Sequence, residues 1–153
     1  MRVESLKKIK SVKHISLKKI IFIIIAAVVF SCKKSTDSIP PAQVDFYLYL
    51  TQPEFQSLNT VGNHVYVTGG VKGIIVYHKT VEEFVAFERS CPYDPNVNGA
   101  IVDVDSSGLG MVDYKCGSRF NILDGSIVTG PTSYPLRQYY CEYDGVSTLH
   151  IHN

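Results

Sequence analysis

Short runs of β-branched and aromatic residues recur along the chain from about residue 60 onward. Gly, Asn, Asp and Pro stand between the runs, as they do between the strands of all-β domains. Residues 81–84 have the composition of a single helical turn. We therefore predict one all-β domain, with strands at 65–67, 73–77, 84–87, 101–104 and 136–143.

Two Asp-Gly pairs mark tight turns in this pattern. Asp124-Gly125 lies within 123–126, and Asp144-Gly145 lies within 143–146. Because Gly adopts positive φ angles without steric cost, such pairs favour the short turns of β-hairpins. We expect a hairpin at each position.

The first 31 residues have a different pattern. Seven of the 15 Lys and Arg residues fall there, and an unbroken apolar run of 11 residues covers 20–30. A membrane-spanning helix needs about 20 apolar residues, whereas signal peptides have shorter apolar cores. The run ends at Ser31-Cys32, which resembles the lipobox of bacterial lipoproteins. We predict a lipoprotein signal peptide at 1–31, a lipidated Cys32 opening a tether at 32–43, and a domain at 44–153.

This prediction implies a bacterial cell-envelope location, with the domain outside the cytoplasm and anchored to a membrane through lipid on Cys32. A plain N-terminal membrane anchor, with Cys32 an ordinary thiol, is the alternative and leaves the domain in the same place. Without residues 1–31 the chain has 8 basic and 13 acidic residues, a formal charge of −5. We expect no nucleic-acid partner, since such a partner needs a basic face.

Two cysteine-bearing segments and a later Gly-Pro pair carry the candidate chemistry. Cys91-Pro92-Tyr93 follows the strand at 84–87, Cys116 opens a Gly-Ser-x-Phe segment, and Gly130-Pro131 comes after both. In this order they resemble the two cluster loops and the proline loop of a Rieske [2Fe-2S] domain. The resemblance covers about residues 58–152. It implies a Rieske-like fold, a small β-sandwich or barrel whose two cysteine-bearing loops lie side by side.

The resemblance also assigns the positions of the cluster ligands. Cys91 matches the first cysteine, and Tyr93 stands where the first histidine is expected. The Gly-Ser-x-Phe match sets Cys116 at the second histidine position and Asp113 at the second cysteine position. Both histidine ligands of the family are therefore missing. The neighbours that the resemblance places around the loops are Pro92, Tyr93, Asp113, Gly117, Ser118, Phe120, Gly130 and Pro131.

The missing histidines determine which cofactor we expect. A Rieske centre needs two thiolates on one iron and two imidazoles on the other. If Cys116 is instead taken as the second cysteine, Arg119 occupies the histidine offset, and a guanidinium does not bind metal. Tyr93, Asp94 and Asp113 offer oxygen atoms, which suit iron-sulfur chemistry poorly. We expect no cofactor, and the family resemblance leaves an atypically ligated [2Fe-2S] cluster as the alternative.

Without a cluster, the resemblance brings Cys91 and Cys116 together on adjacent loops in a compartment where disulfides persist. A bond between them would close 26 residues and contribute about 3 kcal/mol in the chain-entropy model. We expect this disulfide, with two unlinked cysteines as the alternative. Cys141 is expected to be a small buried apolar side chain. The alternative is that it bonds to Cys91 or Cys116 or is a reactive thiol.

The sequence leaves three functions open, and no catalytic residues are expected because no Gly-x-Ser-x-Gly or comparable motif is present. The first is a cluster-free binding or scaffold module. The second is an electron-transfer protein with an atypical cluster, and the third is a thiol-disulfide redox protein. His150 and His152 would share a strand face, but we expect a frayed or solvated chain end there. We expect His64 and His78 to be exposed or hydrogen-bonded.

Overall fold

The domain is built around an antiparallel hairpin of β3 (Ile74–Thr80) and β4 (Glu83–Glu88) in the computed structural model, which describes residues 39–153. Each strand contains an unbroken run of four buried apolar residues, 74–77 in β3 and 84–87 in β4, because both faces of the hairpin are covered. Ile74 and Val76 pack into one core on one face, whereas Ile75 and Phe87 pack into a second core on the other. The hairpin therefore joins two separate hydrophobic clusters.

A six-stranded antiparallel sheet contains this hairpin, in the order β1-β10-β9-β4-β3-β2. A 3-10 helix, η1 (Pro53–Asn59), follows β1 and contributes the fully buried Leu58 to the first core. The other strands are β1 (Asp45–Tyr49), β2 (His64–Val67), β9 (Gln138–Tyr143) and β10 (Thr148–His152).

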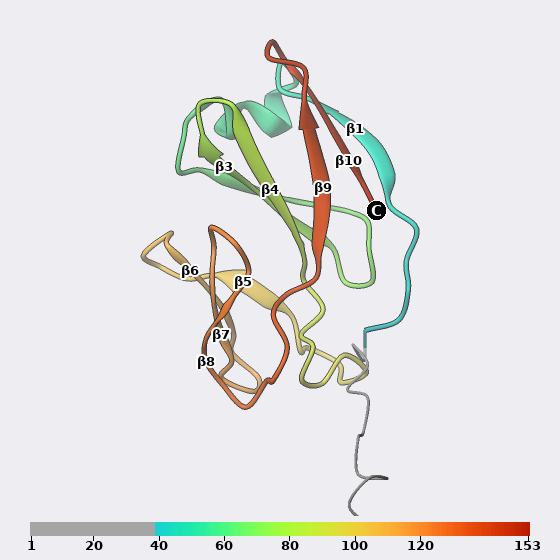
Figure 1. Ribbon diagram of the computed structural model, residues 1–153, viewed down its shortest axis with the longest axis vertical. Coiled ribbons are helices and arrows are strands. Elements are labelled where there is room, and N and C mark those ends of the chain that lie inside the picture. The colour runs from blue at the N-terminus through green and yellow to red at the C-terminus, as the bar shows by residue number, and fades with distance from the viewer. Residues whose placement is uncertain (1–38) are drawn as a thin grey trace, which may run out of the picture. The chain divides into compact units, whose positions relative to one another are not determined.

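A second, four-stranded antiparallel sheet covers the other face of the hairpin, in the order β5-β6-β7-β8. Met111 and Phe120 of this sheet are fully buried and pack in the second core with Phe87 of β4. Figure 1 shows the small sheet lying at one end of β4 and β9. Its strands are β5 (Val102–Val104), β6 (Gly110–Asp113), β7 (Arg119–Asn121) and β8 (Ile127–Thr129).

The all-β prediction is confirmed, and each predicted strand corresponds to an observed one: β2, β3, β4, β5 and β9. Both Asp-Gly hairpins are also present, with Gly125 at φ +70° and Gly145 at φ +78°. The predicted helical turn at 81–84 is wrong, because these residues form the turn into β4 and its first positions. The frayed C-terminus is wrong too, since β10 is paired by β1 on one side and β9 on the other.

The predicted signal peptide, and Cys32 with it, lie outside the described residues. Within 39–153, no helix has the length and apolar character needed to cross a membrane. The last residues of the predicted tether lie along the domain. The Arg137 guanidinium donates hydrogen bonds to the carbonyls of Ile39 at 2.6 Å and Pro40 at 2.7 Å.

Candidate functional site

The first cysteine-bearing loop leaves β4 and runs to β5, carrying Cys91, which is fully buried in the second core. Its start is fixed by the buried carboxylate of Glu88. Oε1 of Glu88 accepts hydrogen bonds from the N–H groups of Ser90 at 2.8 Å and Lys72 at 2.9 Å. Oε2 accepts hydrogen bonds from Val71 N–H at 2.7 Å and the Tyr139 hydroxyl at 2.8 Å. Four donors thus satisfy one buried charge and hold the loop in place.

The second loop is the tight connection between β6 and β7. The N–H of Asp113 donates to the Ser118 carbonyl at 2.9 Å, and the N–H of Gly117 donates to the Asp113 carbonyl at 2.8 Å. Gly117 has φ +83°, which L side chains rarely adopt. This turn places Cys116 at the tip of the loop with Asp113 buried at its base.

The Gly-Pro loop lies against the second loop, as the resemblance implies. A Cβ added to Gly130 would come within 2.8 Å of Ser118 Oγ and 3.0 Å of Ser118 Cα. Ser118 Oγ accepts hydrogen bonds from the Cys116 thiol at 3.0 Å and from Thr132 N–H at 3.4 Å. Ser118 is therefore buried between the two loops and links them, while Pro131 itself is exposed.

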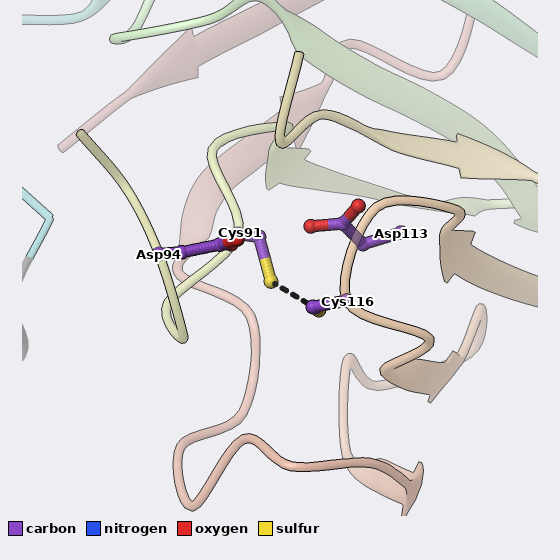
Figure 2. Close-up of side chains that lie close together, drawn as sticks. All are labelled: Cys91, Asp94, Asp113 and Cys116. Carbon is purple, nitrogen blue, oxygen red and sulfur yellow. Dashed lines mark hydrogen bonds between the residues drawn. The ribbon is translucent and has the colours of Figure 1, made fainter. Parts of the chain in front are cut away.

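Cys91 and Cys116 lie together, with their Sγ atoms 3.6 Å apart (Figure 2). A disulfide has a sulfur-sulfur distance of about 2.05 Å, so the expected bond is absent. Both residues are free cysteines whose thiols are in contact. Cys141 is a free cysteine as well. The prediction that the two loops bring these residues together is right, and the prediction that they are bonded is wrong.

Two carboxylates join the sulfurs, and Figure 2 shows that each loop supplies one of them. One candidate ligand atom each from Cys91, Asp94, Asp113 and Cys116 all lie within 4.8 Å of one another. Oδ1 of Asp113 accepts a hydrogen bond from Lys115 N–H at 2.7 Å, but its buried Oδ2 has no partner. Oδ1 of Asp94 is buried and unpartnered as well. We call these four residues the loop cluster.

The environment of the loop cluster disfavours a free thiolate on Cys91. Burial raises the pKa of this thiol far above its ordinary value. The N–H of Tyr93 acts in the opposite direction, and the neighbouring Asp113 and Cys116 side chains raise the pKa further. Cys91 is therefore a protonated thiol at neutral pH in the absence of a cation.

Tyr93 stands at the position that the resemblance gives to the first histidine. The Tyr93 side chain is 54% exposed, and Pro92 beside it is buried. Phe120 is fully buried in the second core and supports β7 beneath the loop. No histidine belongs to the loop cluster.

Sequence reasoning missed one buried polar group, Glu88, and misjudged another, His78. No sequence pattern marks Glu88 as a buried carboxylate, because its hydrogen-bond donors come together only when the chain folds. His78 is buried and stacks on Phe84 with ring centroids 4.2 Å apart, and neither ring nitrogen has a hydrogen-bond partner within 39–153. The expectation that His78 is exposed or hydrogen-bonded is therefore wrong.

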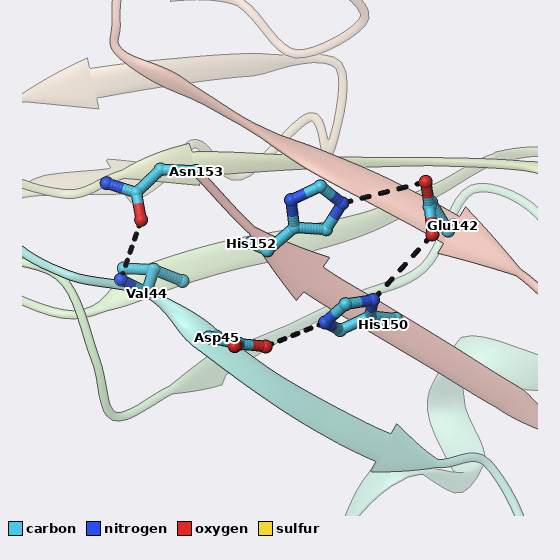
Figure 3. Close-up of polar contacts among 6 residues, drawn as sticks. All are labelled: Val44, Asp45, Glu142, His150, His152 and Asn153. Atoms are coloured by element: carbon cyan, nitrogen blue, oxygen red, sulfur yellow. Dashed lines mark hydrogen bonds and ion pairs between the residues drawn. The ribbon is translucent and has the colours of Figure 1, made fainter.

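A second group of potential ligands lies on β9 and β10, where Glu142 faces His150 and His152 (Figure 3). The carboxylate of Glu142 is 3.7 Å from a ring nitrogen of each histidine. Nε2 of His150 is also 2.8 Å from Oδ1 of Asp45. The Glu142 side chain is 71% exposed, so these are surface polar contacts that solvent also reaches.

No protein-family model matches the chain, and no curated protein matches it. Among solved structures, the chain is similar to one in the complex of reduced oxygenase and oxidized ferredoxin in carbazole 1,9a-dioxygenase. The TM-score is 0.46 at 19% sequence identity, covering 69% of this chain and 92% of that chain. The all-β class of the domain follows from its own strands and sheet pairing.

Proposed function

We propose that this protein is a lipid-anchored binding module of the bacterial cell envelope, built on a Rieske-like domain that does not hold a Rieske [2Fe-2S] cluster. The observation that carries the proposal is the composition of the loop cluster, which offers two thiols and two carboxylates and no imidazole. The anchor follows from the lipobox-like Ser31-Cys32, and the Rieske-like arrangement from the loop order and the adjacency of Cys91 and Cys116.

A two-iron cluster fits these residues poorly for a second reason. Its two ligand pairs bind different irons at opposite ends of the cluster, so they must be further apart than two ligands of one ion. The candidate ligand atoms of the loop cluster all lie within 4.8 Å of one another. Hard carboxylate oxygens in place of imidazole nitrogens also match iron-sulfur chemistry poorly.

A thiol-disulfide redox function is not favoured. Such proteins use an exposed thiol of lowered pKa. Cys91 is fully buried and its pKa is raised, chiefly by burial. The acidic balance of the chain after residue 31 gives no support to a nucleic-acid partner.

The test of the proposal is the chromophore and the iron and labile sulfide content of the full-length protein, expressed in bacteria supplied with iron and extracted in detergent. We expect a colourless protein without stoichiometric sulfide. Two irons and two sulfides per chain, with visible absorbance, would instead establish the electron-transfer alternative.

A further inference from the structure

We propose that the loop cluster, Cys91, Asp94, Asp113 and Cys116, is a binding site for a single divalent transition-metal ion of the zinc type. This inference rests on the proposed function in one respect, since it requires that no two-iron cluster occupies the two loops.

The first argument is the spacing of the four ligand atoms. Zinc binds sulfur at about 2.3 Å and carboxylate oxygen at about 2.0–2.2 Å, which sets two sulfurs of a tetrahedral site about 3.8 Å apart. The Sγ atoms of Cys91 and Cys116 are 3.6 Å apart. This separation is too long for a disulfide and close to that of two thiolates on one ion. The four candidate ligand atoms all lie within 4.8 Å of one another, so they need to move together by at most about 1 Å to reach the spacing of a tetrahedral site.

The second argument is the presence of buried oxygens without partners. Asp113 is fully buried, its Oδ2 has no hydrogen-bond partner, and buried Oδ1 of Asp94 has none either. Neither carboxylate forms an ion pair with a Lys, Arg or His within the part of the chain that the structure describes. Because an unpaired buried carboxylate is strongly destabilising, such atoms call for a cation or its equivalent. Figure 2 shows the Asp113 carboxylate facing the sulfur atoms.

The third argument is the set of donors behind the ligands. A dianionic pair of thiolates with two carboxylates leaves excess negative charge around a divalent ion, which backbone N–H groups can disperse. Ser118 N–H lies 3.4 Å from Cys116 Sγ, and Lys115 N–H lies 2.7 Å from Asp113 Oδ1. Cys91 receives the N–H of Tyr93. Three of the four proposed ligands thus have a backbone N–H group beside them that would stabilise their negative charge.

The ligand set also selects among metals. Two sulfurs exclude Mg²⁺ and Ca²⁺, which prefer all-oxygen sites, while two carboxylates disfavour Cu⁺. Zinc accepts both ligand types in a tetrahedral arrangement, and four protein ligands give the closed coordination of a structural site. The ion would bridge the β4–β5 and β6–β7 loops at the place where the family resemblance puts the iron-sulfur cluster.

The experiment is a titration of the full-length protein in detergent, stripped of metal under reducing conditions, with Zn²⁺ and with Co²⁺. We expect one equivalent of either metal to bind, a rise in melting temperature, and sulfur-to-cobalt charge-transfer absorption that shows thiolate ligation. D113N and C116S should each weaken binding by at least about 100-fold, since loss of a residue that contacts the metal costs at least as much as loss of a residue behind it.

D113N separates a ligand from a structural carboxylate. Asn keeps the acceptor for Lys115 N–H and removes a buried charge, so the metal-free variant should melt at the same temperature as metal-free wild type or higher. D105N is the matched control, because Asp105 caps a turn through Ser107 without touching the loop cluster. It should lower stability and leave metal affinity unchanged.

H152A tests the surface group on β9 and β10 and should also leave metal affinity unchanged. Binding that survives D113N and C116S but is lost in H152A would overturn the proposal. Absence of any stoichiometric metal would overturn it as well, while leaving the cluster-free binding module intact. Two irons with two sulfides would overturn both.

Discussion

Glu88 shows how one residue prepares the site without belonging to it. Its carboxylate is fully buried, and four hydrogen-bond donors satisfy its two oxygens. Gly70 has to be glycine next to it, because a Cβ there would collide with Glu88 Oε2 and come within 2.8 Å of the Tyr139 hydroxyl. This arrangement anchors the strand end from which Cys91 follows.

Replacing Glu88 with Gln should therefore destabilise the domain, although Gln has nearly the same shape as Glu. The amide nitrogen would face N–H donors that now point at an oxygen, so we expect the free energy of unfolding to fall by about 3 kcal/mol. Urea denaturation measures the change. E83Q is the control, since Glu83 makes only an exposed pair with Lys79, and a loss in E88Q no larger than in E83Q would contradict the role given to Glu88.

Cys141 makes a pH-dependent contribution to stability. Burial raises its pKa from 9.0 to about 12, so the unfolded chain loses this proton at lower pH than the folded chain does. The folded state binds more protons between pH 9 and pH 12, and stability therefore falls as pH rises through that window. We expect C141A to show a shallower decline than wild type in denaturation series over this range. Parallel declines in the two proteins would contradict this assignment.

At the scale of elements, the Gly-Pro loop supports the second cysteine-bearing loop. An alanine at Gly130 would push against Ser118 Oγ, Cα and Cβ at 2.8–3.0 Å, and Ser118 Oγ contacts the Cys116 thiol. We expect G130A to cost about 1–3 kcal/mol, as small overpacking does, and to speed alkylation of Cys116. Thermal denaturation and mass-spectrometric thiol mapping measure the two effects. T129A, at an exposed neighbouring position, should change neither; equal behaviour of the two variants would argue against the packing role.

The sequence predicts strands best where packing covers both faces. The continuous apolar runs of β3 and β4 predict strands whatever their neighbours, and the Asp-Gly pairs predict the hairpins at Gly125 and Gly145. The strands β1 and β6 were not predicted, and β7, β8 and β10 were expected only as the unplaced arms of the Asp-Gly hairpins, because their short segments mix apolar and polar residues. The 3-10 helix η1 was not predicted; its Phe55 and Leu58 pack on the first core.

The candidate site could be predicted in part. Motif order alone indicated that Cys91 and Cys116 meet, with Asp94 and Asp113 as oxygen donors nearby. The sequence could not distinguish a disulfide from free thiols, since that depends on a sulfur-sulfur distance set by two loops from different sheets. Nor could it show that Asp113 and Asp94 have buried oxygens without partners.

At the scale of the whole molecule, we propose that a lipid tether anchors this domain to a membrane. If Cys32 carries lipid, the mature chain begins at Cys32, and cells supplied with labelled palmitate should incorporate label into wild type but not into C32S. C141S is the matched cysteine control and should retain the label. A mature protein that still begins at Met1 and carries no label would identify the plain membrane anchor instead.

The central claim is that two Rieske-like loops hold one metal ion in place of a two-iron cluster. Native mass spectrometry of the full-length protein, extracted from bacterial membranes under reducing conditions, tests it most directly. We predict a mass increased by one divalent ion in wild type and no increase in D113N. A mass increased by two irons and two sulfides, or an ion retained equally by D113N, would contradict the account.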